Sequence, residues 1–528
     1  MPQTSFWQRR PALCALCIIL LTTAVRLWFV ASGQLDLVQD EAQYWDWSRR
    51  LQLSYYSKGP LIAWVIAFWT SIAGDTELGV RLGSIMHGAV AQGLLYLGMA
   101  HLFRRPQLGL LTLVVANTTP LFLAAGILST TDSPLLVCWL ICMLALHEAT
   151  RRPRAVLPYA LLAICMALGV LAKYMMLAAA GMALVHMALL ARHKLLPQGM
   201  AWRALCAMAA GALVGMVPIV AWNMANDWVS FRHVATLAGV SGKAAQSFLQ
   251  PARLPEHLGG QIGIVTPWWL AFMLWGGWRA LRMAWQGNIP HDDPASTLER
   301  SEAIRQAALL AAFFWPLWGS ITLWSLHTRI YPNWPGMSYA AGIMLGAWAL
   351  ERLLSGWGSL RARKLVPLWL TLGIALFALA HVQNMLPLPP KYNPATRLKG
   401  WADLGEKLDE LRLAQPDPQK VFYFSDAYDI TAELAFYAPG KPYTYCVDFG
   451  RRMSQYDIWP APYDKTGWSA LFVRRDGNDI PMQLRTMFDE AEILRYDSTH
   501  RGKPGRSFSI IVLRGFNGTW PRQTTGRY

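Results

Sequence analysis

The chain has 528 residues, of which 54% are hydrophobic and only 15% are charged. Soluble domains carry about 25% charged residues, so this composition excludes a soluble enzyme, a disordered chain, a secreted disulfide scaffold and a coiled coil, and it indicates a polytopic membrane protein. The formal net charge of +16 comes mainly from short Lys and Arg clusters between apolar segments. This pattern is typical of cytoplasmic loops and argues against nucleic-acid binding.

The first apolar run, residues 11–30, follows Arg9 and Arg10. It is long, contains Arg26 near its far end and lacks a small-residue cleavage site, so we interpret it as a retained span with a cytoplasmic N-terminus rather than a signal peptide. The shorter run 60–74 predicts a helix at the membrane surface. Further apolar windows bring the total to about eleven spans. They are 78–103, 108–127, 134–149, 156–172, 175–190, 204–222, 258–281, 307–326, 336–353 and 365–385.

The loop after the first span, about residues 32–77, carries the densest polar and aromatic cluster, with Asp40, Glu41, Tyr44 and Asp46 in one short segment. Two adjacent carboxylates cannot both face the same side of a helix, so at most one of them points at a membrane-level site. The sequence leaves two interpretations open. Either both acids stabilise a helix N-terminus, or one of them has a catalytic role.

Two lysines lie where a cation needs an anionic partner. Lys58 precedes the predicted surface helix, where a lipid phosphate could pair with it or its side chain could reach to headgroups. Lys173 interrupts a long apolar stretch. A charge at that depth requires a partner or a water-filled cavity, which favours a functional role.

The tail after residue 385 is long enough to form a domain. It opens with a proline-rich linker, and strand-like runs at 421–424, 443–447, 470–473 and 508–513 follow. Helical patterns at 398–413, 429–436 and 480–488 separate or flank these runs. We therefore predict a small α/β domain on the side of the membrane opposite the N-terminus.

Several short polar motifs follow one another in a fixed order along the apolar part of the chain. They are Asp40-Glu41-Ala-Gln-Tyr44-Trp-Asp46-Trp, Tyr55-Tyr56-Ser57-Lys58-Gly59-Pro60, Gly79-Val-Arg81-Leu, Thr131-Asp132-Ser-Pro134, Lys173-Tyr174, Trp222-Asn223 through Asp227-Trp228 to Phe231-Arg232, and Pro332-Asn333-Trp334-Pro335. Over residues 36–339 this order resembles the bacterial GT-C membrane glycosyltransferases. That superfamily contains protein O-mannosyltransferases, lipid A aminoarabinose transferases and lipid A galacturonosyltransferases.

The resemblance implies a polytopic α-helical GT-C fold of about eleven transmembrane helices, with a long first periplasmic loop and a small C-terminal α/β periplasmic domain. The expected boundaries are a transmembrane glycosyltransferase domain at 1–385, a linker at 386–397 and the periplasmic domain at 398–528. The expected location is a bacterial inner membrane.

The resemblance also assigns roles to individual positions. Asp40, with its neighbour Glu41, matches the acidic residue that acts as general base or organises the site. Lys58, Lys173, Arg232 and Arg329 match positions that contact the donor phosphate. The expected substrate pocket comprises Tyr44, Tyr56, Asp132, Tyr174, His233 and Asn333.

The implied partners are a polyprenyl-phosphate sugar donor, a lipid or glycan acceptor and membrane lipids, with no nucleic acid. Relatives often carry a carboxylate near the position of Ser57 that helps to hold a divalent metal. A neutral hydroxyl is a poor replacement, so a metal at this site would depend on Glu41 or Asp46. A divalent metal is left open without an assigned ligand set, and no other cofactor is predicted.

Two other functions would also fit many spans with rare internal charges. A secondary transporter or flippase of lipid-linked sugars would have two matching halves with broken segments near the bilayer midplane, and no such repeat is seen. A non-catalytic scaffold would use the membrane part only to present the tail. Replacement of Asp40 separates both from a transferase, because only a transferase would lose its function.

Overall fold

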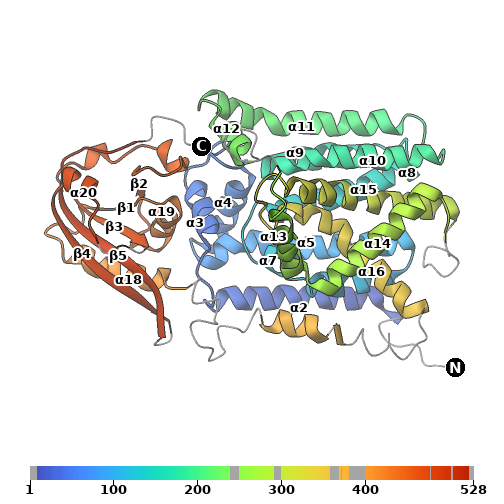
Figure 1. The fold of residues 1–528 in the computed structure, drawn as a ribbon, viewed down its shortest axis with the longest axis horizontal. Helices are drawn as coiled ribbons and strands as arrows, with labels where there is room; N and C mark the ends of the chain where they lie inside the picture. The colour runs from blue at the N-terminus through green and yellow to red at the C-terminus, as the bar shows by residue number, and fades with distance from the viewer. Residues whose placement is uncertain are drawn as a thin grey trace. The chain divides into compact units, whose positions relative to one another are not determined.

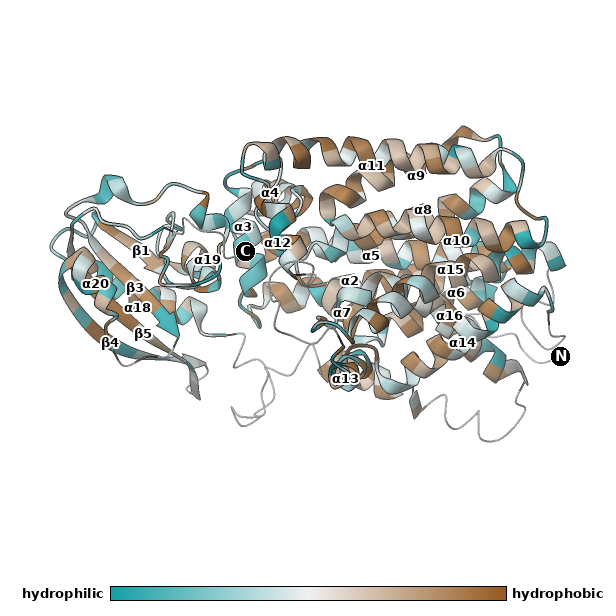
Figure 2. Cartoon of the chain, turned by 45° about the horizontal axis from the view of Figure 1, so that its top comes forward, coloured by the Kyte–Doolittle hydropathy of each residue, from teal (hydrophilic) through white to brown (hydrophobic). Residues whose placement is uncertain are grey.

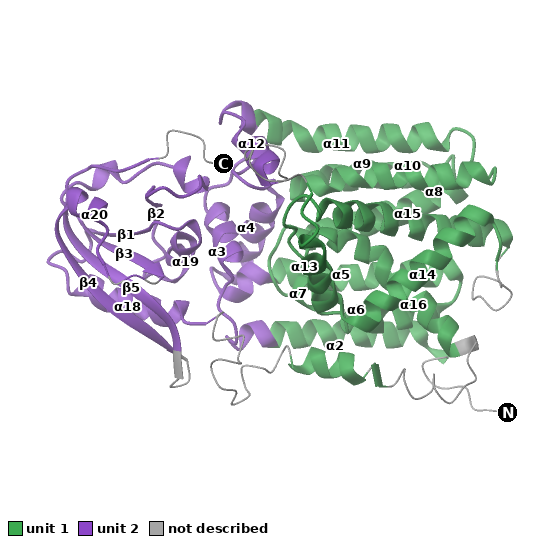
Figure 3. Ribbon diagram, viewed as in Figure 1, with its two compact units in different colours: residues 1–28, 82–221, 238–381 green, residues 29–81, 222–237, 382–528 purple. Residues whose placement is uncertain are grey.

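The computed structural model describes residues 9–237, 249–289, 299–356, 368–369, 371–379, 399–475, 477, 479–500 and 503–522. The chain forms two compact units, which Figure 3 shows in different colours. Unit 1 comprises residues 1–28, 82–221 and 238–381, and unit 2 comprises residues 29–81, 222–237 and 382–528. The predicted linker at 386–397 lies outside the described residues, so the boundaries at 385 and 398 stay predictions.

Unit 1 contains most of the long helices (Figure 1). In chain order its helices, with those that continue into unit 2, are α2 (Pro11–Ala31), α5 (Glu77–Phe103), α6 (Pro106–Asn117), α7 (Pro120–Ala125), α8 (Asp132–Arg151), α9 (Val156–Ala172), η1 (Tyr174–Leu177), α10 (Ala178–Arg192), α11 (Met200–Met224), α13 (Arg253–Val265), α14 (Pro267–Gln286), α15 (Arg300–Trp324), η3 (Trp334–Met337) and α16 (Ser338–Gly356).

Within the described ranges, five helices are long and apolar enough to cross a membrane, or up to six if α4 (Leu61–Ala73) and α5 form one bent span. Apolar side chains also cover outward faces, as Leu213, Val214 and Val217 of α11 show with exposed fractions of 65–70%. Figure 2 shows this hydrophobic colouring along the helices of unit 1. Such surfaces contact lipid rather than water, and the predicted class of polytopic helical membrane protein is confirmed.

Two predicted spans are wrong in their continuity. The span expected at 108–127 is divided into α6 and α7, and the span expected at 258–281 is divided into α13 and α14. Each break lies directly before a proline, since Pro120 opens α7 and Pro267 opens α14. Proline has no N–H and disfavours helical geometry in the preceding residue, and Thr119 and Thr266 accordingly leave the α region.

Unit 2 contains a five-stranded sheet in the order β2-β1-β3-β5-β4. The strands are β1 (Val421–Ser425), β2 (Tyr445–Cys446), β3 (Ser469–Arg475), β4 (Phe488–His500) and β5 (Lys503–Phe516). β1 is parallel to β2 and β3, whereas β5 is antiparallel to β3 and β4. The predicted C-terminal α/β domain is therefore confirmed.

Helices cover this sheet and extend the unit. They are α3 (Gln39–Ser48), α4, α12 (Val229–Leu237), α18 (Trp401–Leu413), α19 (Tyr428–Tyr437), η7 (Gln455–Asp457), η8 (Tyr463–Lys465) and α20 (Met482–Met487). Side chains alternate along β1, so Val421 and Tyr423 pack with α18 and α19, while Phe422 and Phe424 pack with the side of α20. The helix expected at 480–488 ends as α20 at Met487, and the long strand β4 follows it.

Helices α14 and α16 lie side by side in unit 1, and a glycine permits their close approach (Figure 1). A Cβ atom at Gly276 would lie 2.3 Å from the Leu345 carbonyl oxygen, whereas a Cβ at Gly181 of α10 would meet nothing within 4 Å. We expect Gly276→Ala to lower the free energy of unfolding by about 1–3 kcal/mol through overpacking. Gly181→Ala is the control, because alanine favours a helix and adds no clash there. Equal apparent Tm values for the two purified variants would contradict this packing argument.

Candidate active site

A buried ion pair fixes the start of α3 in unit 2. Arg81 Nε donates to Glu41 Oε1 at 3.0 Å and Arg81 Nη2 donates to Glu41 Oε2 at 2.6 Å, and neither residue has solvent exposure. The same guanidinium donates to the carbonyl oxygens of Leu35 and Asp36 at 2.8 and 2.7 Å. The Val38 N–H donates to Glu41 Oε2 at 2.9 Å. Both oxygens of Glu41 are therefore engaged in holding the loop that precedes α3.

The C-terminal domain holds the same loop through side chains from distant parts of the sequence. Asp36 accepts hydrogen bonds from Lys399 Nζ and from the Trp401 N–H, each at 2.9 Å. The Tyr437 hydroxyl accepts from the Leu37 N–H at 2.7 Å and donates to Glu77 Oε1 at 2.6 Å. These bonds connect the first loop of the chain with α18 and α19.

Asp40 differs from its neighbour Glu41 because its side chain reaches solvent. Desolvation by the surrounding protein raises the pKa of Asp40, and the nearby Lys58 opposes that rise. Glu41 and Asp429 add to the increase in pKa by charge repulsion. Asp40 is therefore an accessible carboxylate with raised basicity and a cation within electrostatic reach.

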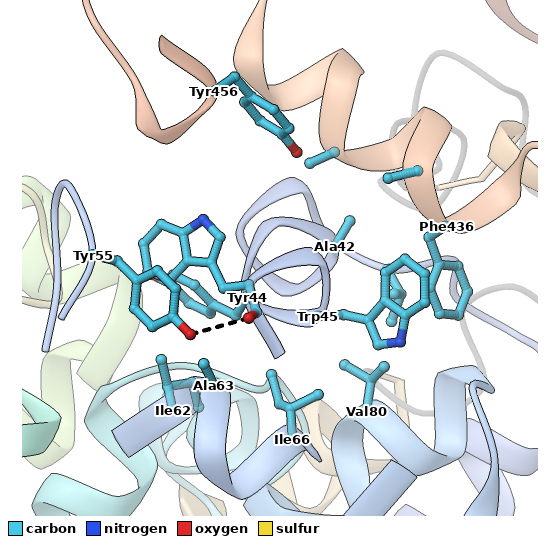
Figure 4. Close-up of a cluster of buried hydrophobic side chains, with 14 of the residues drawn as sticks. Ala42, Tyr44, Trp45, Tyr55, Ile62, Ala63, Ile66, Val80, Phe436 and Tyr456 are labelled. Carbon is cyan, nitrogen blue, oxygen red and sulfur yellow. Dashed lines mark hydrogen bonds between the residues drawn. The ribbon is translucent and has the colours of Figure 1, made fainter. Parts of the chain in front are cut away.

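Aromatic side chains form a packed cluster around α3, as Figure 4 shows. Tyr44 is buried in this cluster, and Trp47 stacks on Tyr55 with ring centroids 4.5 Å apart. Trp45 meets Phe436 of α19 edge to face at 4.9 Å. The structure thus places Tyr44 in a hydrophobic core, where its exposed fraction is only 3%.

The residues present do not fit a metal centre at α3. Glu41 is engaged by Arg81, and Asp46 is buried, paired with Arg49 and bonded by the Tyr456 hydroxyl at 2.9 Å. Among the side chains that the structure describes, no group of three or more His, Cys, Asp or Glu could hold a metal ion.

The turn that carries Lys58 is fixed by α12 and by the C-terminal domain. The Ser230 hydroxyl donates to the Tyr55 carbonyl at 2.9 Å, and the Tyr56 N–H donates to Gln455 Oε1 at 2.7 Å. The Tyr56 ring lies 4.7 Å from the ring of His233. Arg232 is exposed on the adjacent position of α12.

His233 is 8% exposed, and burial lowers its pKa to about 4, assisted by the charges of Lys58 and Arg452. Its imidazole is therefore neutral at neutral pH. Lys58 influences both His233 and Asp40. Four residues that the sequence predicted, Asp40, Tyr56, Lys58 and His233, consequently lie in one region of unit 2.

Unit 1 contains a second group of predicted residues. Lys173 Nζ lies 2.8 Å from Asp132 Oδ1, and Asn333 Nδ2 donates to Asp132 Oδ2 at 3.0 Å. Asp132 and Asn333 line a pocket of about 190 Å³ whose other walls are mostly apolar. Tyr174 follows Lys173 as the first residue of η1, whereas Arg329 forms an exposed ion pair with Glu256 at 3.0 Å.

Sequence reasoning missed several residues that organise these regions. Arg81 was named in a sequence motif, but no role was predicted for it. A charge near the start of an apolar helix needs a partner, and this requirement could have indicated the ion pair. Gln455 and Tyr456 had no local signal, because their partners lie about 400 positions earlier in the chain. Arg452 had none either, since the His233 whose pKa it lowers lies in the distant helix α12.

Known proteins resemble the chain in sequence and in fold. Residues 57–222 match the family described as dolichyl-phosphate-mannose-protein mannosyltransferase. The lipid A galacturonosyltransferase RgtD of Rhizobium johnstonii is 29% identical over 341 residues, which cover 63% of this chain. The match spans 65% of the length of that curated relative.

Two crystal structures of ArnT from Cupriavidus metallidurans share the fold. The apo structure has a TM-score of 0.61 at 15% identity and covers 95% of this chain and 98% of ArnT. The structure bound to undecaprenyl phosphate has a TM-score of 0.59 at 16% identity and covers 94% of this chain and 97% of ArnT. The fold and these matches define a multi-pass membrane protein of the GT-C type. The chain is similar in sequence and in fold to membrane glycosyltransferases of the GT-C type, which agrees with the resemblance of its ordered motifs.

Loss of the buried ion pair should destabilise unit 2. Arg81→Ala leaves the Glu41 charge buried without its partner, and we expect the free energy of unfolding to fall by about 3–5 kcal/mol. Arg412→Ala, which removes the surface partner of Asp409, should cost no more than about 1 kcal/mol. The apparent Tm of each purified variant checks the difference. Equal losses would show that the buried pair does not hold the loop.

Proposed function

We propose that the protein transfers a sugar from a polyprenyl phosphate, undecaprenyl phosphate in a bacterium, to an envelope acceptor such as lipid A, another glycolipid or a protein hydroxyl. The reaction would take place on the periplasmic side of the inner membrane. The observation that carries this proposal is the juxtaposition of Asp40, a solvent-accessible carboxylate of raised pKa, with Lys58. The match to the mannosyltransferase family model and the similarity to RgtD support the reaction class, and ArnT bound to undecaprenyl phosphate supports the kind of donor.

The chemistry follows from these two charges. Asp40 accepts the proton of the acceptor hydroxyl while the acceptor oxygen forms a bond to the anomeric carbon of the sugar. The bond between that carbon and the donor phosphate oxygen breaks, and the leaving phosphate retains the electron pair. Lys58 stabilises the charge on the phosphate. A single displacement of this kind inverts the anomeric carbon, and Glu41 contributes by holding α3 in place.

The pocket of unit 1 suits a ligand that has both polar and apolar parts. Asp132 and Asn333 offer a hydrogen-bond acceptor and a donor at a mostly apolar wall. Lys173 neutralises Asp132, which lowers the cost of a carboxylate at this depth. We assign this pocket to substrate recognition, in agreement with the role expected for Asp132 and Asn333.

Asp40→Asn tests the proposal directly. The amide cannot accept the acceptor proton, so we expect transfer to fall by about 10²–10⁴-fold. The measurement is mass spectrometry of envelope glycolipids and polyprenyl-phosphate sugars in a deletion strain that carries each variant at equal membrane levels. Glu406→Gln, which alters an exposed acid on α18, should restore the wild-type pattern. Full restoration by Asp40→Asn would reject the transferase and favour a transporter, a flippase or a scaffold.

The pH dependence provides a second test. Transfer requires ionised Asp40, so kcat/KM should fall as the pH drops through its pKa, which lies above the ordinary range for an aspartate. Lys58 lowers this pKa, and Lys58→Gln should therefore move the acid limb to higher pH. Asp429 raises the pKa of Asp40, and Asp429→Asn should therefore move the acid limb of the kcat/KM profile to lower pH. Shifts in the same direction for both variants would contradict Asp40 as the base.

A further inference from the structure

Two adjacent arginines of the C-terminal domain have different surroundings. Arg451 donates to both carboxylate oxygens of Asp457 at 2.7 Å and to the carbonyl oxygens of Cys446 and Val447. Its charge is therefore neutralised inside the domain. Arg452 is exposed, and among the described residues no carboxylate forms an ion pair with its guanidinium.

The backbone at Arg452 is held against the first loop and α12. The side chain of Met453 packs on the cluster of Tyr56, Trp222 and Val229. Gln455 accepts the Tyr56 N–H at 2.7 Å, and the Ser454 N–H donates to Asp457 Oδ2 at 2.7 Å. These contacts within unit 2 fix Arg452 beside the turn of Lys58, although the two residues lie far apart in the sequence.

His233 supplies a polar group within electrostatic reach of both cations. Its ring packs on Tyr56, and its buried Nδ1 has no hydrogen-bond partner in the described part of the chain. Buried polar atoms of this kind normally have a partner, so the vacant hydrogen-bonding capacity points to a ligand. Lys58 and Arg452 both lie close enough to disfavour protonation of this imidazole.

We propose that Arg452 of the C-terminal domain joins Lys58 and His233 in a phosphate-binding subsite. An arginine fork matches phosphate oxygens through two parallel hydrogen bonds, and a neutral imidazole can donate a further one. The assignment rests on the proposed function and deepens it, because the tail then supplies a substrate-binding residue. The phosphate belongs either to the polyprenyl donor or to a phosphorylated lipid acceptor.

Binding to the purified full-length protein tests this subsite without turnover. The probes are undecaprenyl phosphate and its neutral counterpart undecaprenol. We expect Arg452→Gln to weaken binding of undecaprenyl phosphate by about tenfold or more, the loss typical of a charge-assisted hydrogen bond, and to leave undecaprenol unchanged. Arg485→Gln, at an exposed position on α20, is the matched control and should bind both lipids as the wild type does.

A second pair of probes, lipid A and enzymatically dephosphorylated lipid A, identifies the source of the phosphate. A selective loss for lipid A assigns the subsite to the acceptor, and a selective loss for undecaprenyl phosphate assigns it to the donor. If Arg452→Gln binds both phosphorylated lipids as Arg485→Gln does, the proposal is overturned. Should Asp40→Asn restore all envelope sugars while Arg452→Gln loses phosphate binding, the transferase is rejected and the subsite stands.

Discussion

The Glu41–Arg81 ion pair is the constraint on which the first loop depends. Removing two charges from water is costly, and the pair recovers that cost only because the remaining hydrogen-bonding groups are also satisfied. Arg81 uses its other donors on two loop carbonyls, and Glu41 also accepts the Val38 N–H. The pair therefore sets the direction of α3, and through it the position of Asp40. Two consecutive acids thus have different environments: Glu41 is buried with both carboxylate oxygens bonded, whereas Asp40 is an exposed residue whose carboxyl group is partly desolvated.

The C-terminal domain also holds the first loop and α3 in place. Tyr437, Tyr456 and Gln455 each bond to the first loop or to α3, and Lys399 pairs with Asp36. Tyr437 and Gln455 accept hydrogen bonds from backbone N–H groups of the first loop, whereas Tyr456 and Lys399 add bonds to carboxylates that have a second partner. The loop and the domain therefore stabilise one another. Variants of the tail should consequently affect α3 even where they touch no substrate.

The sequence predicted the features that depend on a local pattern of residues, such as apolar helices and isolated charges. Apolar windows located most of the long apolar helices that the structure describes, whereas the span expected at 365–385 lies largely outside the described residues. The isolated charge of Lys173 indicated a partner, which is Asp132. Helix breaks at Thr118-Thr119 and Thr266 were missed because hydropathy averages conceal a single proline. Strand β4 was missed because charged residues interrupt its alternation at the sheet edge, where few of its side chains are buried. The contacts of Tyr456 and Gln455 depend on chain closure over hundreds of residues, which no local pattern encodes.

The charges around Asp40 address a conflict inherent in the proposed reaction. A cation that binds phosphate also lowers the pKa of a neighbouring carboxylate and makes it a weaker base. Lys58 has this effect on Asp40, whereas desolvation, Glu41 and Asp429 act in the opposite direction. Glu41 can exert its effect from a fixed position only because Arg81 holds it there. The Glu41–Arg81 ion pair would therefore have two effects on the proposed reaction. It positions Asp40, and it holds Glu41 where its charge keeps the pKa of Asp40 high beside a phosphate-binding cation.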